Sequence, residues 1–309
     1  MLKEIDITWI LFAGILSLLF LVSIVGQIFK QMVSNEKMSA MVKVFNERVG
    51  LWWAMCGVFT VAAFTGGLGS IIVFGLTSFL LLREFITITP TRKGDHHTLF
   101  WVFFIILPLQ YFFLLRDWYG MFIILIPVYA FLFIPLRIAI TGETYGFMER
   151  TAKIQWALMI CIYCISHAPA LLKVDFPGEP KMGLRLLLFL CLIVQTNDIT
   201  QLIFSYVNKN NGAKLIAGLL VSTIIGASLW WATPFTIFQA AAMAALIVFM
   251  GTAGNFCYAA MVQDRRKPGV VVVQTRQSMT ERVISLCFAA PVFFHIARYY
   301  FTNRPPIAF

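Results

Sequence analysis

The stretch Gly251–Phe294 reads GTAGNFCYAAMVQDRRKPGVVVVQTRQSMTERVISLCFAAPVFF, and it decides how the rest of the chain is interpreted. Apolar residues dominate both of its ends, and basic residues gather in its middle, at 262–282. Each apolar end extends to the length of about 20 residues that a helix needs to cross a bilayer. We therefore predict two membrane helices, at 238–261 and 283–302, joined by a basic loop.

The composition of the whole chain is that of a polytopic membrane protein. Of its 309 residues 60% are apolar and 12% are charged, whereas soluble domains carry roughly 25% charged residues. We predict an all-α bundle forming a single membrane domain over 1–309, with N-terminal helices in 1–180 and a C-terminal part in 181–309. The ten predicted spans are 8–29, 51–66, 69–88, 98–115, 119–138, 154–173, 184–204, 214–236, 238–261 and 283–302.

The distribution of Lys and Arg predicts the orientation in the membrane. If the N-terminus lies outside the cytoplasm, 17 of the 24 basic residues fall in inner loops and seven on the outer side. Because cytoplasmic loops are enriched in Lys and Arg, we predict that both termini face away from the cytoplasm. The net charge of +10 is then a topology signal, and nucleic-acid binding is not needed to explain it.

Between the first two predicted spans, Ser34–Gly50 has the pattern of an amphipathic helix lying in the membrane interface. Apolar residues such as Met38 and Phe45 recur at helical spacing, while Lys43 and Arg48 occupy other faces. Such a helix either attracts anionic lipid or acts as a topological anchor.

Polar residues inside the predicted spans mark a candidate site, because each one is costly in hydrocarbon. The segment Gln195–Gln201 (QTNDITQ) has six polar residues in seven, and Asn255 lies at a similar depth in another span. Together with the basic loop 262–282, these residues predict a cavity on the inner side. The alternative is that they form hydrogen bonds between helices.

Two other residue types are interpreted as packing residues. His167 is expected to be a buried histidine in the helix core. The six cysteines all fall inside apolar spans and are expected to behave as small hydrophobes. Cys161 and Cys164 form a CxxC pair, but no second pair or matching His spacing accompanies them, so we predict no metal site there.

Short motifs in a fixed order give the chain a resemblance to a known family. They include Arg83-Glu84-Phe85, Gly94-Asp95-His96, Trp118-Tyr119-Gly120, Glu149-Arg150-Thr151, Ser166-His167-Ala168, Asn197-Asp198 and Ala290-Pro291-Val292. The chain resembles the phosphatidate cytidylyltransferase (CDP-diacylglycerol synthase) family, in particular its shorter bacterial branch, over most of its length. The resemblance implies a protein of phospholipid metabolism in the bacterial inner membrane. Family members join phosphatidic acid to CTP and release pyrophosphate, with Mg²⁺ on membrane-embedded aspartates.

The C-terminal signature of that family is altered where it carries negative charge. The signature reads roughly G-D-x-x-x-S-x-x-K-R, then K-D, then P-G-H-G-G-x-x-D-R-x-D. Asn255, Pro268 and Ile284 stand at three of its aspartates, and Tyr258 stands at its serine. The family's S-P-x-K-T-x-E-G loop, associated with the nucleotide site, has no counterpart in Ser205–Lys214.

The residues that remain define the candidate site that the resemblance implies. Asp198 and Glu281 are the candidate catalytic residues and the candidate ligands of one Mg²⁺, with Asp264 as a further acid. The candidate phosphate or lipid ligands are Asn197, Asn255, Lys267, Arg276 and Arg282. Mg²⁺ binds through one or two carboxylates plus substrate phosphates, so these residues allow one weak site and no two-metal arrangement.

Three functions are compatible with this set of residues. The first is a pseudoenzyme, a divergent paralogue that binds an anionic phospholipid or a membrane-protein partner without efficient catalysis. The second is an active transferase that uses CTP and Mg²⁺ to convert phosphatidic acid into CDP-diacylglycerol. The third is a transporter or channel, which would need a polar path across the outer half of the membrane. A homodimer is a further expectation, and no nucleic acid is expected as a partner.

Overall fold

A computed structural model describes residues 7–32, 36–65, 67–88, 92–176, 179, 181–207, 210–264 and 278–302. These residues form helices and turns and contain no strand, which confirms the predicted all-α fold. Within them, nine helical segments are long and apolar enough to cross a membrane. The chain is therefore an integral membrane protein.

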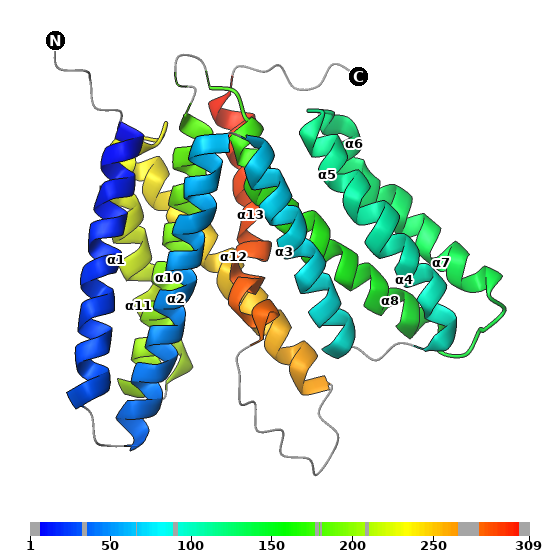
Figure 1. Ribbon diagram of the computed structural model, residues 1–309, viewed down its shortest axis with the longest axis horizontal. Helices are drawn as coiled ribbons and strands as arrows, with labels where there is room; N and C mark the ends of the chain where they lie inside the picture. Colours follow the sequence, from blue (N-terminus) through cyan, green and yellow to red (C-terminus); the bar gives the residue numbers. More distant parts are fainter. Residues whose placement is uncertain are drawn as a thin grey trace. The chain divides into compact units, whose positions relative to one another are not determined.

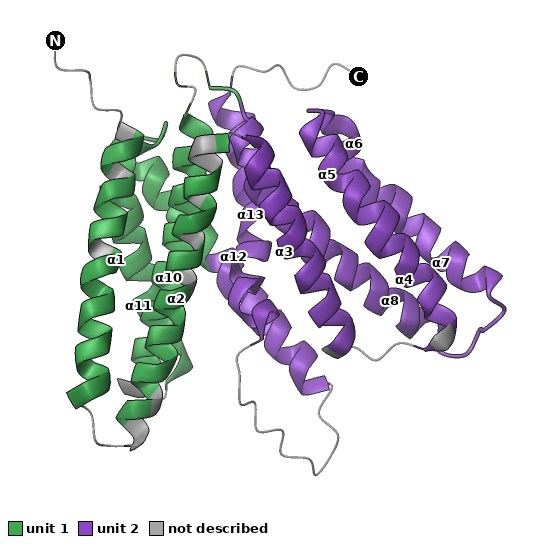
Figure 2. Cartoon of the chain, viewed as in Figure 1, with its two compact units in different colours: residues 1–66, 175–248 green, residues 67–174, 249–309 purple. Residues whose placement is uncertain are grey.

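The described residues form two compact units, and each unit combines an N-terminal with a C-terminal segment of the chain (Figure 2). Unit 1 holds residues 1–66 and 175–248, and unit 2 holds residues 67–174 and 249–309. The single domain expected over 1–309, with its division near residue 180, stays a prediction.

Unit 1 is built from four long helices and the beginning of another. They are α1 (Ile7–Met32), α2 (Glu36–Thr65), α10 (Met182–Val207), α11 (Asn211–Ser228) and the first half of α12 (Ile237–Asp264). Helix α2 packs against α1 and α10, and α10 packs against α11. Leu19, Val49 and Cys56 form a buried apolar cluster where α1 and α2 meet.

Helix α2 corrects the sequence analysis. The predicted interfacial helix 34–50 and the predicted span 51–66 belong to one continuous helix, so the predicted boundary after Gly50 is wrong. A glycine inside a helix costs only about 1 kcal/mol relative to alanine, and it does not end a helix that packs along its length. Arg48 is not on an exposed face either, because only 8% of its surface is accessible. The nine candidate spans do not include α2, so its crossing and the predicted orientation stay predictions.

Unit 2 contains two uninterrupted helices, α3 (Gly67–Ile88) and α13 (Met279–Phe301), and the second half of α12. Its other three spans each contain a π-helical turn. These spans are α4 (His96–Trp101), η2 (Val102–Ile106) and α5 (Leu107–Leu115); α6 (Tyr119–Ile124), η3 (Leu125–Ala130) and α7 (Phe131–Ile140); and α8 (Phe147–Leu158), η4 (Met159–Cys164) and α9 (Ile165–Ala170). Helix α3 packs against α5 and α9, α7 packs against α8, and α13 packs against α9 and α3 (Figure 1).

His167 lies in the core of unit 2 and is fully buried. Its ring centroid lies 4.9 Å from that of Phe122, 4.6 Å from that of Tyr163 and 5.3 Å from that of Phe294. Its Nδ1 is 2.7 Å from the carbonyl oxygen of Tyr163, one helical turn earlier. These contacts confirm the predicted packing role.

Candidate functional site

The residues predicted for the site are divided between the two units. Asn197 and Asp198 belong to unit 1, whereas Asn255, Glu281 and Arg282 belong to unit 2. Lys267 and Arg276 lie outside the described residues. The convergence of all these residues on one cavity therefore stays a prediction, and each unit is described by itself.

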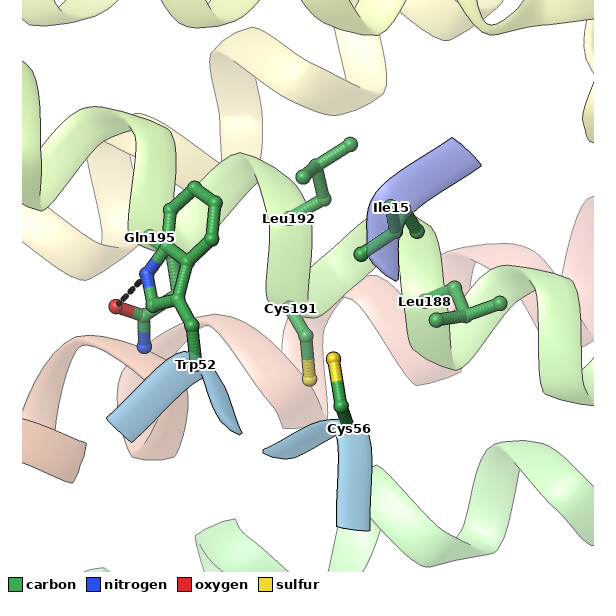
Figure 3. A pocket seen from close by; sticks show the side chains of 7 residues that line it. All are labelled: Ile15, Trp52, Cys56, Leu188, Cys191, Leu192 and Gln195. Carbon is green, nitrogen blue, oxygen red and sulfur yellow. Dashed lines mark hydrogen bonds between the residues drawn. The ribbon is translucent and has the colours of Figure 1, made fainter. Parts of the chain in front are cut away.

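In unit 1, Asp198 is one rung of a ladder of side-chain pairs between α2 and α10. The pairs are Arg48 with Asp198, Trp52 with Gln195, and Cys56 with Cys191, each about one helical turn from the next. Arg48 Nη1 lies 3.6 Å from Asp198 Oδ2, and Trp52 Nε1 donates to Gln195 Oε1 over 3.1 Å. In the third pair the two sulfur atoms point toward each other inside a small pocket (Figure 3).

The ion pair in this ladder is buried. The side chains of Arg48 and Asp198 are 10% and 4% exposed. Next to it, Asn197 is 1% exposed and its Oδ1 accepts a hydrogen bond from Gln201 Nε2 at 2.9 Å. Within unit 1, Gln195 and Asp198 of the polar segment 195–201 therefore join α10 to α2, as in the alternative interpretation of this segment, whereas the Asn197–Gln201 bond lies within α10. The charge of Asp198 faces a cation of the protein itself.

In unit 2, the predicted site residue Asn255 lies where α12 crosses α13. Its Oδ1 accepts a hydrogen bond from Ser285 Oγ at 3.0 Å. The two helices approach closely because Gly254 has no side chain; a Cβ there would lie 2.9 Å from the ring of Phe288 and 3.0 Å from the Ile284 carbonyl oxygen. Ile284, at the position of a family aspartate, is 1% exposed. The crossing thus holds a neutral hydrogen bond and an apolar side chain.

The first turn of α13 is held by a residue that the sequence analysis did not include among the site residues. Glu84 Oε1 accepts from the Met279 N–H at 2.8 Å, and Oε2 accepts from the Thr280 N–H at 3.2 Å. The first N–H groups of a helix lack partners within it and carry partial positive charge, so a carboxylate satisfies them well. An acidic residue inside the apolar span 69–88 was the available signal, because such residues are rare in spans.

Ser278 completes this helix start. Its Oγ accepts from the Glu281 N–H at 3.0 Å, which makes it the N-cap residue. The Tyr258 hydroxyl lies 2.6 Å from the same Oγ atom and ties the end of α12 to the start of α13. Tyr258 occupies the position at which the family signature has serine, and its hydroxyl contacts Ser278.

A cavity of about 500 Å³ lies beside Tyr258 in unit 2, between the ends of α3 and α12 and the beginning of α8. Phe85, Trp156 and Met261 give it apolar walls, and the ionisable residues Glu149, Lys153 and Asp264 also line it. Lys153 pairs with Glu149. Its volume falls within the range of about 300–1,000 Å³ that is usual for small-molecule sites. The cavity therefore combines apolar walls with ionisable groups.

Two of the motifs shared with the family meet in a buried ion-pair network. Arg150 Nε donates to Asp95 Oδ1 at 2.8 Å, and Arg150 Nη1 donates to the Glu143 carbonyl oxygen at 2.7 Å. Asp95 is 1% exposed, and its other oxygen accepts from the Arg92 N–H at 3.0 Å. The network joins the start of α4 to the start of α8, so both motifs have a structural role.

The described part of the chain contains no group of three His, Cys, Asp or Glu side chains that could hold a metal ion. Glu281 lies in the first turn of α13 and Asp198 lies in α10 of the other unit. Among the described residues, each unit taken alone therefore contains one of the two predicted metal ligands: Asp198 in unit 1 and Glu281 in unit 2.

The helices and their buried polar contacts define a polytopic helical membrane protein. The chain belongs to the cytidylyltransferase family, whose sequence profile matches residues 46–300. This match confirms the family resemblance. The chain is also 28% identical over 265 residues to "Uncharacterized protein YnbB" of Escherichia coli (strain K12), covering 82% of this chain and 87% of that protein. No solved structure matches the chain.

Proposed function

We propose that this protein is a catalytically degenerate member of the cytidylyltransferase family that binds an anionic phospholipid, phosphatidic acid or a close analogue, in the bacterial inner membrane. The observation that carries the proposal is the α12–α13 crossing. Where the family resemblance implies aspartates, Asn255 is bonded to Ser285 and Ile284 is buried. An amide oxygen that accepts from a hydroxyl, and an alkyl chain, supply no negative charge for Mg²⁺.

The remaining predicted acids support the same conclusion. Mg²⁺ prefers carboxylate and phosphate oxygens in near-octahedral geometry. Asp198 lies 3.6 Å from the Arg48 guanidinium, so its charge is already balanced within unit 1. At the start of α13, the Glu84 carboxylate accepts hydrogen bonds from the Met279 and Thr280 N–H groups. At a free helix terminus, such N–H groups would attract a phosphate.

The lipid part of the proposal rests on the cavity beside Tyr258. Its apolar walls suit the glycerol backbone and the upper acyl chains, and Lys153, which pairs with Glu149, is its basic lining residue. In the sequence, Arg265, Arg266 and Lys267 follow directly after Asp264, which lines the cavity. The roles proposed for Lys267, Arg276 and Arg282 as phosphate ligands rest on their place in the basic stretch 262–282.

Filling this cavity should weaken lipid binding. Ala152 lines the cavity, and Ala152→Trp introduces a large ring there. We expect the purified protein to retain phosphatidic acid over phosphatidylcholine with the same acyl chains, and Ala152→Trp to weaken that retention about tenfold, which is about 1.4 kcal/mol. Native mass spectrometry of the protein released from mixed micelles, without CTP, measures the bound lipid.

The matched control is Ala54→Trp, because Ala54 is an exposed alanine on α2 in the other unit. This variant should retain phosphatidic acid as the unmodified protein does. Equal retention of the two lipids by the unmodified protein, or unchanged retention by Ala152→Trp, would contradict the proposed binding site.

A further inference from the structure

Cys56 and Cys191, the third pair of the ladder between α2 and α10, have no role in the proposed lipid site. Both cysteines are free, and they are 7% and 5% exposed. Their sulfur atoms point toward each other from the two helices (Figure 3). Two thiols that face each other can undergo a reaction that a single buried cysteine cannot, which is the formation of a disulfide bond within the chain.

The neighbouring pair of the ladder keeps the two thiols opposed. Trp52 lies one helical turn before Cys56 on α2, and Gln195 lies one turn after Cys191 on α10. The hydrogen bond of 3.1 Å between Trp52 Nε1 and Gln195 Oε1 joins these turns. Because residues four apart lie on the same face of a helix, this bond also fixes how the two helices are turned at the level of the cysteines. The opposed thiols are therefore a feature of the packed helix pair.

The pocket between the cysteines contains a small empty volume of about 30 Å³. One water-sized group needs roughly 10–15 Å³, so this volume admits about two such groups. Among the described residues that line the pocket none is charged, and its two polar neighbours, Trp52 and Gln195, bond to each other. The rest of the described lining is aliphatic and consists of Ile15, Leu188 and Leu192. Such a space suits an uncharged molecule with two heavy atoms, because a charged one would lose its hydration there.

We propose that Cys56 and Cys191 form a reversible modification site, at which a small uncharged peroxide converts the two thiols into a disulfide that links α2 to α10. Hydrogen peroxide is the simplest molecule of this class, and its two oxygen atoms and lack of charge match the volume and the lining of the pocket. This inference goes beyond the proposed function, because it involves neither lipid nor nucleotide and lies in unit 1.

The reaction consists of two steps. In the first step one thiol sulfur attacks a peroxide oxygen: an S–O bond forms, the O–O bond breaks, and the thiol proton passes to the departing oxygen, which leaves as water. The product is a sulfenic acid, which condenses with a second thiol. In that second step an S–S bond forms, the S–O bond breaks, and the second thiol proton leaves with the hydroxyl group as water. Two thiol sulfurs are oxidised, and the two peroxide oxygens are reduced to water.

Burial has opposite effects on the two steps. A thiol is a weaker nucleophile than a thiolate, and an apolar pocket favours the thiol, so the first step is slow. The second step is fast, because the partner thiol is already in position and the reaction takes place within one molecule. The sulfenic acid is therefore converted into the disulfide before more peroxide oxidises it irreversibly.

The test treats the full-length protein in detergent micelles with hydrogen peroxide and then compares intact masses, free thiols after unfolding and linked peptides. We expect the mass to fall by two hydrogen atoms and two of the six cysteines to resist alkylation, with the peptides of Cys56 and Cys191 joined. A reductant added after unfolding should restore all six thiols. Cys56→Ala and Cys191→Ala should each lose this cross-link, whereas Cys257→Ala, in α12 of unit 2, should retain it.

The role of the empty volume is tested with Ile15→Phe, which adds a ring to the lining from α1 and leaves both cysteines in place. We expect this variant to form the cross-link about tenfold more slowly, because the ring and the peroxide compete for the same space. Leu21→Phe is the matched control, since Leu21 lies on the same helix and is 59% exposed, and it should react as the unmodified protein does.

Three results would overturn the proposal. They are two unlinked thiols after peroxide treatment, addition of oxygen atoms to either cysteine in place of the disulfide, and equal rates in Ile15→Phe and Leu21→Phe. If one of the two cysteine variants fails to fold, the other decides alone, because each removes one half of the cross-link.

Discussion

Asp198→Asn should lower the free energy of unfolding by about 3–5 kcal/mol, the usual cost of leaving one partner of a buried ion pair uncompensated. The reason is that the Arg48 side chain is 10% exposed and lies 3.6 Å from the Asp198 carboxylate. Unfolding in mixed micelles by increasing fractions of a denaturing detergent, followed by tryptophan fluorescence, measures the change. A catalytic carboxylate often behaves in the opposite way, because its removal relieves a site kept for function at the expense of stability.

Two further variants make this prediction specific. Glu179→Gln breaks an ion pair with Arg185 in the same unit, in which the Glu179 side chain is 47% exposed and the Arg185 side chain 7%. Because Arg185 still donates to Thr8 Oγ1 at 3.0 Å, this loss should be smaller than that of Asp198→Asn. The double variant Arg48→Met with Asp198→Leu should recover most of the loss, because apolar side chains of similar volume often replace a buried pair without penalty. An Asp198→Asn protein as stable as the Glu179→Gln protein would contradict the structural role assigned to Asp198.

Arg150→Gln should cause a comparable loss, about 3–5 kcal/mol, in unit 2. It leaves Asp95, which is 1% exposed, without the guanidinium that donates to it at 2.8 Å, and it also removes the contact to the Glu143 carbonyl oxygen. The same unfolding measurement applies.

Lys153→Gln is the matched control on the same helix, because Lys153 pairs with Glu149 one turn away at the surface. Such pairs contribute about 0.3–0.5 kcal/mol, so this variant should unfold almost as the unmodified protein does in the absence of lipid. Equal destabilisation by Arg150→Gln and Lys153→Gln would contradict the structural role assigned to the buried Asp95–Arg150 network, and with it the structural role of the Gly94-Asp95-His96 and Glu149-Arg150-Thr151 motifs.

Much of the fold could be predicted because apolar length alone marks a membrane span. The predicted spans 184–204 and 283–302 correspond closely to Met182–Val207 and Met279–Phe301. Helix α2 was divided wrongly, because a change from amphipathic to apolar pattern at Gly50 suggests a boundary that packing against α1 and α10 does not require. The π-helical turns left no recognisable pattern in the sequence.

The site was less predictable, since its decisive contacts join residues far apart in the chain. The loss of carboxylates at Asn255 and Ile284 was visible by alignment with the family signature. The pairing of Asp198 with Arg48, 150 residues earlier, could not be predicted, because Arg48 lies in a segment with the pattern of a surface helix. Glu84 could not be assigned to the start of α13 either, because the N–H groups that it binds lie 195 and 196 residues later in the chain.

We propose that cytidylyl transfer has been lost in this protein, for an electrostatic reason. CTP and phosphatidic acid bring several negative charges to one place, and their repulsion opposes reaction unless positioned cations offset it. Metal ions normally fill that role and also orient the phosphates. Asn255, Pro268 and Ile284 leave such cations few ligands, and Ser205–Lys214 lacks the family's nucleotide loop. Restoring aspartate at these three positions should therefore not be sufficient to restore activity.

The most direct test is the Mg²⁺-dependent conversion of radiolabelled CTP into lipid by the purified protein supplied with phosphatidic acid. An active member of the family, assayed alongside, shows that the conditions support the reaction. We predict no CDP-diacylglycerol above background from this protein. Clear turnover that disappears in a folded Asp198→Ala variant would contradict the claim and would identify a transferase working with a single metal ion.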